Sequence, residues 1–299
     1  MIGKGKVMST ITIDHVTKKF GDNTVIKDFS ATIDDGCFAT FLGPSGCGKT
    51  TMLRLVAGFE RPDAGEIRID DVTVSGKGVF VSPEKRQIGM VFQSYAVWPH
   101  MNVFDNVAYP LKIMKLPKDT VRQKVSEALE MVHMNGLEKR MPSQLSGGQQ
   151  QRIALCRALV AQPKVLLLDE PLSNLDARLR EEMRCEIKEL QQRLKITVIY
   201  VTHDQREAMT MSDVVFVLNE GVIEQSGSPV ELYRDPKDGF VENFLGKVNF
   251  LEGEVCGDRI RLAAKEQYID RKTDLEKTVE IAIRPDDVYI INNGSFLND

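Results

Sequence analysis

Near the start of the chain the sequence reads Gly43-Pro44-Ser45-Gly46-Cys47-Gly48-Lys49-Thr50, and Thr51 follows. This run matches in full the pattern G-x-x-x-x-G-K-[ST] of loops that bind phosphate groups. The glycines let the backbone curl so that successive N–H groups point at phosphate oxygens, and Lys49 adds a positive charge for the β and γ phosphates. The hydroxyl of Thr50 is a suitable ligand for Mg²⁺. We therefore expect this loop to bind ATP together with Mg²⁺.

The segments on either side of the loop separate this interpretation from a chance match in a glycine-rich turn. Residues 37–42 are a short apolar run, typical of a buried strand. Residues 50–57 predict a helix, and Gly58 stands where a helix C-cap is expected. A strand that enters the loop and a helix that leaves it are the context that the motif requires, and the positive end of the helix faces the anion.

An acidic pair, Asp169 and Glu170, directly follows a second apolar run at residues 165–168. Open parallel sheets bind their ligands at the carboxyl ends of the strands. We expect Asp169 to hold Mg²⁺ across from Thr50, and Glu170 to orient and polarise the attacking water. Two consecutive acids can also simply end a strand, but their pairing with the phosphate loop favours nucleotide hydrolysis.

The order of the elements predicts an α/β fold. Residues 165–168, a helix with an apolar stripe from Leu175 to Leu194, and residues 197–201 follow one another as in a parallel crossover unit. Helical spacing at residues 121–134 and 149–161 predicts a helical subdomain over about residues 94–162. Further strand patterns cover residues 10–33, 65–74, 88–92, 214–218 and 222–225.

Short alternating strands separated by polar turns follow residue 246, with no helix pattern. We therefore predict two domains, residues 8–245 and a small all-β domain over residues 246–299.

The 299 residues carry a net charge of −4, which gives no basic field for nucleic acid. Five scattered cysteines indicate reduced thiols in the cytosol, and no apolar run approaches the roughly 20 residues that span a bilayer.

The most specific segment is Leu145-Ser146-Gly147-Gly148-Gln149, which lies in the helical region just before the acidic strand. It offers a hydroxyl, bare glycine N–H groups and the positive end of a helix, and is therefore a second anion site. Here the sequence resembles the ATP-binding cassette (ABC) ATPases, whose signature these five residues match. The resemblance implies a RecA-like P-loop core with an antiparallel β subdomain. It also implies that the segment completes the ATP site of a second copy in a head-to-tail dimer that closes on ATP.

The same resemblance gives roles to four further segments. It implies that Phe20 stacks on adenine, that Gln93 senses Mg²⁺ and the attacking water, that residues 173–176 act across the dimer, and that His203 contacts the γ-phosphate. Without the resemblance, a strand-end Phe is more often part of the core, and a lone His after a strand has no assigned role. Catalysis is then expected from Lys49, Gln93, Glu170 and His203.

A single cassette without a membrane-spanning segment resembles the ATPase of an importer. The implied partners are transmembrane permease subunits, with a solute-binding protein acting indirectly, and the implied location is the cytoplasmic face of the cell membrane. Residues after 246, with Ile283-Arg284-Pro285-Asp286, resemble a shortened form of the OB-like regulatory domain of maltose, polyamine and ferric-ion import ATPases. The overall texture is closest to the ferric-ion subgroup, with a polyamine, a sugar, a sugar phosphate or another small anion as alternatives.

Two weaker expectations concern single side chains. Tyr95 and Trp98 form either a docking surface for a partner helix or part of the packed core. Cys47, beside Lys49 and a helix N-terminus, is expected to have a lowered pKa and to be reactive.

A DNA- or ribosome-acting cassette is the rival function, but the chain has neither a second cassette nor a long coiled coil. A regulatory nucleotide-binding module without turnover is disfavoured by the presence of Glu170 and His203.

Overall fold

The computed structural model describes residues 9–246, 249–256, 259–262, 268–270, 278–283, 291–292 and 295–296. The chain forms two compact units, which divide between residues 230 and 231. The sequence placed a boundary at residues 245–246. Two short helices account for the difference, because α7 (Pro229–Arg234) crosses the division and α8 (Gly239–Leu245) follows it.

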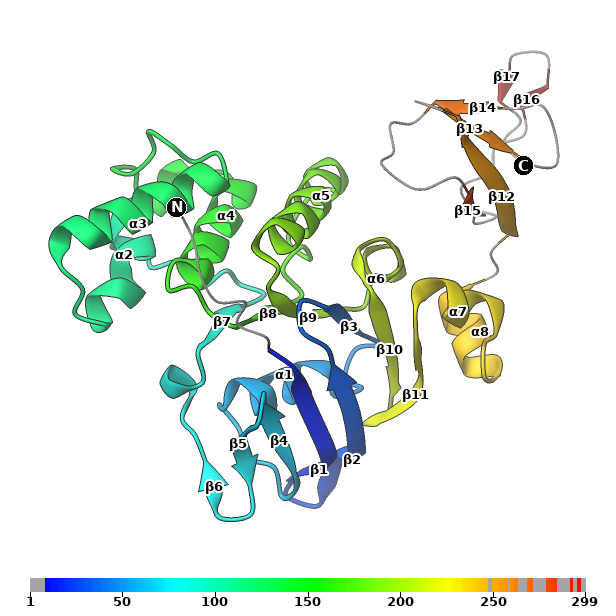
Figure 1. Ribbon diagram of the computed structural model, residues 1–299, viewed down its shortest axis with the longest axis horizontal. Helices are drawn as coiled ribbons and strands as arrows, with labels where there is room; N and C mark the ends of the chain where they lie inside the picture. Colours follow the sequence, from blue (N-terminus) through cyan, green and yellow to red (C-terminus); the bar gives the residue numbers. More distant parts are fainter. Residues whose placement is uncertain are drawn as a thin grey trace. The chain divides into compact units, whose positions relative to one another are not determined.

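A six-stranded sheet forms the centre of the first unit (Figure 1). Neighbouring strands are parallel except for the antiparallel pair β10–β11, which agrees with the parallel crossover expected from the sequence. All residues of β3, β8 and β9 are buried, because helices or a second sheet cover both faces. In spatial order the strands are β11 (Val222–Gly227), β10 (Val214–Asn219), β3 (Phe38–Leu42), β9 (Thr197–Thr202), β8 (Val165–Asp169) and β7 (Ile88–Val91).

Two hydrophobic cores lie on the two faces of this sheet. Alternate residues of the strands point to opposite faces. Leu168 and Tyr200 therefore join the core that includes the helical region, whereas Leu167 and Ile199 join the core that includes helix α1 (Lys49–Ala57) and the antiparallel sheet. Both cores share the same strands, so the strands that lead into the phosphate loop are packed on both faces.

The antiparallel part of the first unit is a five-stranded sheet. Strands β1 and β2 meet at a two-residue turn, as the pattern of residues 10–33 predicted. After β6 the chain passes through the short η1 (Pro83–Lys85) into β7. The strands are, in spatial order, β2 (Asn23–Ile33), β1 (Ile11–Phe20), β4 (Ala64–Ile69), β5 (Val72–Gly76) and β6 (Val79–Phe80).

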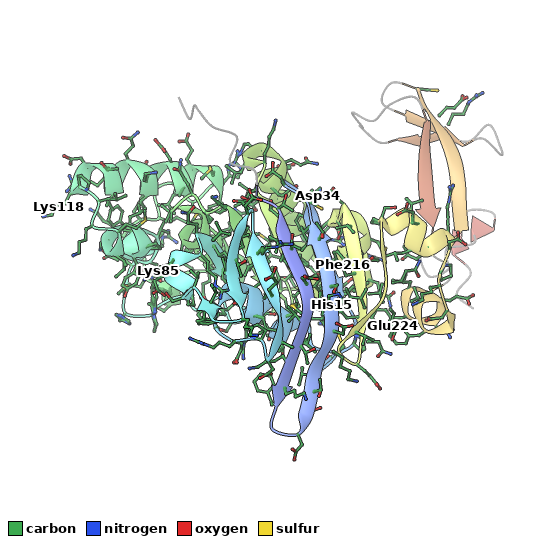
Figure 2. The ribbon with its side chains drawn as sticks, turned by 60° about the horizontal axis from the view of Figure 1, so that its bottom comes forward. His15, Asp34, Lys85, Lys118, Phe216 and Glu224 are labelled. Carbon is green, nitrogen blue, oxygen red and sulfur yellow. The ribbon has the colours of Figure 1, made fainter. Side chains whose placement is uncertain are left out.

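The helical region contains α2 (Val103–Ile113), α3 (Lys118–Met131) and α4 (Gly147–Leu159), with the short η2 (Pro142–Gln144) before α4. The sequence predicted α3 and α4 but missed α2, which has Pro110 inside it. Asn102 caps α2 by accepting a hydrogen bond of 2.7 Å from the Asp105 N–H. In Figure 2 the labelled Lys118 of α3 and His15 of β1 lie well apart, so the helical and antiparallel parts form separate lobes of this unit.

Helix α5 (Ala177–Leu194) joins β8 to β9, and α6 (Gln205–Met211) joins β9 to β10. The second unit holds α8 and a four-stranded antiparallel sheet in the order β14-β13-β12-β15. The OB-like character of the tail remains a prediction, and residues 284–286 of the family segment lie outside the described residues. The strands described after residue 246 are β12 (Asn249–Cys256), β13 (Arg259–Leu262), β14 (Tyr268–Asp270), β15 (Thr278–Ile283), β16 (Ile291–Asn292) and β17 (Ser295–Phe296).

Candidate active site

The phosphate loop connects the end of β3 to the start of α1, and two of its glycines cannot carry a side chain. A Cβ on Gly43 would lie 2.3 Å from the carbonyl oxygen of Leu218. Gly48 has φ 107, in the left-handed region, and a Cβ there would lie 2.6 Å from Cδ1 of Ile26. The loop is thus pressed against the β10–β11 turn and against β2, and these contacts fix its curl.

Lys49 begins helix α1 and is 4% exposed. Its Nζ donates hydrogen bonds to the carbonyl oxygens of Gly43 (2.7 Å) and Pro44 (2.8 Å). The ammonium group therefore lies against the loop that wraps the predicted phosphate position. This places a positive charge where the motif requires one.

Thr50 and Asp169 meet across the loop. The Thr50 hydroxyl donates to Oδ1 of Asp169 at 2.9 Å, which brings together the two side chains that the sequence assigned to Mg²⁺. Burial raises the pKa of the Asp169 carboxyl, and the hydrogen bond from Thr50 offsets part of that rise. A hydroxyl and a buried carboxylate side by side are hard oxygen donors of the kind that Mg²⁺ prefers, so these residues fit the cation.

The register of the parallel strands explains why distant segments converge. Leu42 pairs with Thr202, and Asp169 pairs with Val201. Val91 pairs with Leu168, so β7 ends beside β8. The residues that follow these strand ends, namely the phosphate loop, His203, Glu170 and Gln93, therefore lie along one edge of the sheet.

Glu170 is the centre of a polar cluster at that edge. Its Oε2 lies 3.2 Å from Nε2 of Gln93 and 3.2 Å from Nδ1 of His203. Its φ is 43, a left-handed conformation that is strained for a residue with a side chain. The backbone N–H of Glu170 donates to the Val201 carbonyl at 2.9 Å, and the Ser173 hydroxyl donates to the Glu170 carbonyl at 2.9 Å. These bonds hold the carboxylate in front of the strand end.

The segment 173–176 is connected to the same cluster through Asn174. The Asn174 amide donates to the backbone carbonyl of Gln93 at 2.8 Å. This link joins the loop after β8 to the loop after β7. The predicted role of residues 173–176 across a dimer is not tested by this contact, but the contact ties them to the position of Gln93.

Ser146 and Gln149 form a capping box at the start of α4. The Ser146 hydroxyl accepts from the Gln149 N–H at 3.4 Å, and the Gln149 side chain accepts from the Ser146 N–H at 3.0 Å. A Cβ on Gly148 would lie 2.7 Å from Leu179, so this glycine permits close packing on α5. Within residues 9–246, no hydrogen bond or ion pair joins this segment to residues 43–51. It stands apart from the phosphate loop of its own chain.

Three aromatic side chains, Phe20, Tyr95 and Trp98, were each expected either to bind a ligand or partner or to pack in the core. Phe20 is 47% exposed, so it is not a core residue, and the Lys18 ammonium lies 4.9 Å from its ring centre. Tyr95 is buried, so for this residue the packed-core alternative is correct. Trp98 is half-buried between Tyr109 and Arg157, at 4.6 Å and 4.4 Å from its ring.

The prediction that Cys47 has a lowered pKa is wrong. Cys47 is 2% exposed, and burial raises the pKa of its thiol more than the neighbouring Lys49 lowers it. The β10–β11 turn covers this part of the loop, because the Gly221 N–H donates to the Cys47 carbonyl at 3.0 Å. Local sequence rules cannot detect this tertiary cover.

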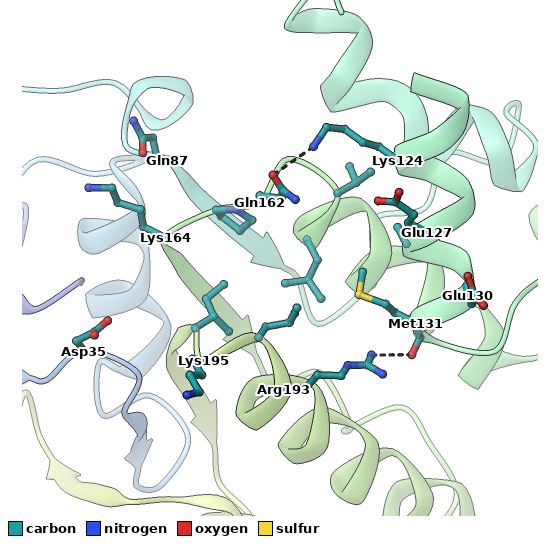
Figure 3. Close-up of a pocket in the computed structure, with 16 residues that line it drawn as sticks. Asp35, Gln87, Lys124, Glu127, Glu130, Met131, Gln162, Lys164, Arg193 and Lys195 are labelled. Carbon is teal, nitrogen blue, oxygen red and sulfur yellow. Dashed lines mark hydrogen bonds between the residues drawn. The ribbon is translucent and has the colours of Figure 1, made fainter. Parts of the chain in front are cut away.

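A cavity of about 1050 Å³ lies away from this cluster, between α3 and the ends of α4 and α5 (Figure 3). Two of the cations that line it are hydrogen-bonded to the protein. Lys124 donates to the Gln162 side chain at 3.2 Å, and Arg193 donates to the Met131 carbonyl at 3.3 Å. Because none of its lining residues belongs to the phosphate loop or the Glu170 cluster, the cavity has no part in the candidate active site.

A phosphate loop, a facing Asp169 and an edge cluster around Glu170 define a nucleotide-hydrolysing P-loop protein. A family profile described as ABC transporter matches residues 26–173. Relatives from three organisms align over nearly the whole chain, and this chain therefore belongs to the ABC transporter ATPases, as an ATPase subunit of the importer type. The family resemblance expected from the sequence is confirmed for the chain.

The relatives and solved structures agree on this assignment. The spermidine/putrescine import ATP-binding protein PotA of Clostridium acetobutylicum is 48% identical over 94% of this chain and 80% of its own length. The Fe(3+) ions import ATP-binding protein FbpC of Vibrio cholerae is 49% identical over 95% and 81%. The trehalose/maltose import ATP-binding protein MalK of Thermococcus litoralis is 47% identical over 94% and 79%.

Two solved structures share the fold. CbiO1 of Clostridium perfringens, part of the ABC transporter complex cbiONQ, superposes with a TM-score of 0.69 at 31% identity, over 75% of this chain and 90% of its own. The dimeric structure of MJ0796, a bacterial ABC transporter cassette, gives 0.65 at 32% identity over 73% and 98%. The expected P-loop core with antiparallel and helical subdomains is thereby confirmed. No helix within the described ranges is long and apolar enough to cross a membrane.

Proposed function

We propose that residues 43–51 and the Glu170 cluster hydrolyse ATP to drive solute import. The observation that carries the proposal is the convergence, at one sheet edge, of the phosphate loop, the Thr50–Asp169 pair and the Glu170–Gln93–His203 contacts. Phe20, exposed beside Lys18, stacks on the adenine. The loop N–H groups and Lys49 hold the phosphates.

In the proposed reaction, Glu170 accepts a proton from water as the water oxygen bonds to the γ-phosphorus and the bond to the ADP oxygen breaks. Gln93 and His203, which both contact Glu170 Oε2, orient the water and the γ-phosphate. Thr50, Asp169 and Gln93 would hold Mg²⁺, which neutralises charge on the phosphates when bound. The buried, hydroxyl-bonded Asp169 supports this assignment.

We also propose that the working form is a head-to-tail homodimer. Ser146, Gly147, Gly148 and Gln149 present a capped helix N-terminus that does not contact its own phosphate loop, and the MJ0796 cassette was solved as a dimer. A second copy would supply this anion site to the first. An isolated monomer should therefore bind ATP but turn it over slowly.

The partners proposed from the sequence are transmembrane permease subunits and, indirectly, a solute-binding protein, which places the chain at the cytoplasmic face of the cell membrane. The three relatives are named as import proteins, and CbiO1 is named as part of a transporter complex, which supports a membrane complex. We propose ferric ion as the solute, with a polyamine, a sugar, a sugar phosphate or another small anion as alternatives, since relatives named for ferric ion, polyamine and sugar import have similar identity. Residues 246–299 would form the OB-like regulatory domain.

The test compares ATPase activity of the purified complex with its permease, in vesicles, for wild type and Glu170→Gln. Wild type should release phosphate, and the variant should bind ATP without releasing phosphate because the amide cannot accept the proton. Glu182→Gln serves as the matched control, since it makes the same change at an exposed carboxylate of α5 outside the cluster and should keep wild-type turnover. Wild-type turnover in Glu170→Gln would contradict the assigned role, and stimulation by ferric-loaded but not polyamine-loaded binding protein would identify the solute.

A further inference from the structure

Glu207, on helix α6, is a buried carboxylate that has no part in the cluster around Glu170. It is 3% exposed, and its Oε2 accepts two hydrogen bonds from the strand β9 that precedes it. The Tyr200 hydroxyl donates at 2.8 Å and the Thr202 hydroxyl at 2.6 Å. Residues 200 and 202 lie on the same face of the strand, so one carboxylate can reach both.

The residues on either side of His203, Thr202 and Asp204, are both held by this hydrogen-bond network. The Thr202 hydroxyl donates to Glu207 and also accepts from the Asp204 N–H at 3.0 Å. Oδ1 of Asp204 in turn accepts from the Arg206 N–H (2.8 Å) and the Glu207 N–H (3.2 Å) at the start of α6. His203 is therefore bracketed by Thr202 and Asp204, while its half-exposed ring reaches Glu170.

The carboxylate supplies an acceptor for two buried hydroxyls, those of Tyr200 and Thr202. Burial raises the pKa of the Glu207 carboxyl, and the hydrogen bonds from Thr202 and Tyr200 offset part of that rise. An apolar side chain of similar size would avoid the cost of burying an acid but would leave both hydroxyls without this acceptor. What an apolar residue cannot do is hold the Thr202 hydroxyl in one rotamer, aimed so that its lone pair closes the turn around His203.

We propose that Glu207 is a positioning residue for His203, acting through the Thr202 hydroxyl. The inference rests on the proposed function, in which the His203 ring faces the γ-phosphate. Since Glu207 contacts neither Glu170 nor the phosphate loop, its effect on hydrolysis passes through the turn. A shift of the imidazole of about 1 Å is enough to lower the rate on the order of 100-fold.

The experiment measures kcat, KM for ATP and melting temperature in the full transporter complex for four variants. Glu207→Ala and Thr202→Val both break the link to the turn, and each should lower kcat by about 10- to 100-fold with KM for ATP unchanged. Tyr200→Phe removes the other hydroxyl on the same carboxylate and is the matched control, which should keep the wild-type kcat. Glu207→Gln retains an acceptor oxygen and should restore most of the activity.

A double-mutant comparison with His203→Ala separates positioning from general destabilisation. Once the imidazole is absent, Thr202→Val should cause no further loss, because the two side chains act in series. The proposal would be overturned if Thr202→Val lowered kcat by the same factor with and without the His203 imidazole. It would also be overturned if Tyr200→Phe lowered kcat as much as Thr202→Val. If Glu207→Ala does not fold, Thr202→Val and Glu207→Gln decide the question. An inactive wild type contradicts the proposed function, whereas an active wild type with a fully active Thr202→Val contradicts only this inference.

Discussion

Replacing Arg86 with methionine removes a buried cation that ties helix α1 to the antiparallel sheet. Arg86 is 3% exposed, and burial lowers the pKa of its guanidinium to about 10. Nη1 donates to the carbonyls of Leu55 (2.9 Å) and Val56 (2.8 Å) in the last turn of α1. A cation at this position also complements the negative end of the helix. The remaining donors reach the carbonyls of Val74 (3.1 Å) and Val81 (2.7 Å) and the hydroxyl of Ser75 (2.7 Å).

The size of the loss follows from what these acceptors retain. The Leu55 and Val74 carbonyls also accept backbone N–H groups, from Gly58 and Val81. The acceptors that lose their partner are therefore mainly the carbonyls of Val56 and Val81 and the Ser75 hydroxyl. Each buried acceptor left unsatisfied costs about 1–3 kcal/mol of stability. Relief of the buried charge offsets part of this, so we expect a net loss of about 3 kcal/mol. That corresponds to a fall in Tm of about 10 °C for a unit of this size.

The assay is urea unfolding followed by circular dichroism, with a thermal melt in parallel. Arg61→Met is the matched control, because both guanidinium groups lie over the Phe80 ring, at 4.2 Å for Arg61 and 5.2 Å for Arg86, but Arg61 is exposed. The control should lose less than about 1 kcal/mol. If Arg86→Met lost no more stability than Arg61→Met, the hydrogen bonds from Arg86 to α1 would not stabilise the fold.

Three further changes probe the loop and its surroundings. Asp169→Asn should abolish Mg²⁺-dependent hydrolysis and raise the Tm of the nucleotide-free protein at neutral pH. Burial raises the pKa of Asp169 in the folded state, so the folded protein loses stability as the pH rises and this carboxyl ionises. The neutral amide of the variant removes this loss. A pH series in which the variant gained no stability above the acid range would refute this. Gly48→Ala should weaken ATP binding in calorimetry, since a Cβ would meet Ile26 at 2.6 Å, while Gly78→Ala, where nothing lies within 4 Å, should leave binding unchanged. Cys47 should be alkylated far more slowly than the exposed Cys185, as followed by mass spectrometry, and equal rates would contradict its burial.

Much of the site could be predicted because its residues follow strand ends that the sequence marks clearly. The buried strands that end just before Gly43, Glu170 and His203 are β3, β8 and β9, and each consists mainly of apolar residues. The spatial order of these strands was not predictable from the pattern, because every apolar run fits every position in a buried sheet. The order β3-β9-β8-β7 is what places Gln93 next to Glu170.

Four helices of the described residues were not predicted from the sequence, α2 for one reason and the short α6, α7 and α8 for another. Helix α2 contains Pro110, which argues against a helix unless the cap at Asn102 is considered first. Helix α6 has seven residues, too few for an apolar period to stand out. Its start was nevertheless marked, since Asp204 and Glu207 have the spacing of a capping residue and the acid three positions later.

The conformation of Glu170 combines what local sequence can and cannot determine. An acid after a buried strand is visible in the sequence, but a φ of 43 is not, because that value is unfavourable for any residue with a Cβ. It persists because bonds from two other segments hold it, from the Glu170 N–H to the Val201 carbonyl and from the Ser173 hydroxyl to the Glu170 carbonyl. Strand β9 thus supports both sides of the cluster, through Val201 for the carboxylate and through Thr202 for His203. A change in β9 should therefore alter the geometry between these two groups more than the binding of ATP, which depends on the loop after β3.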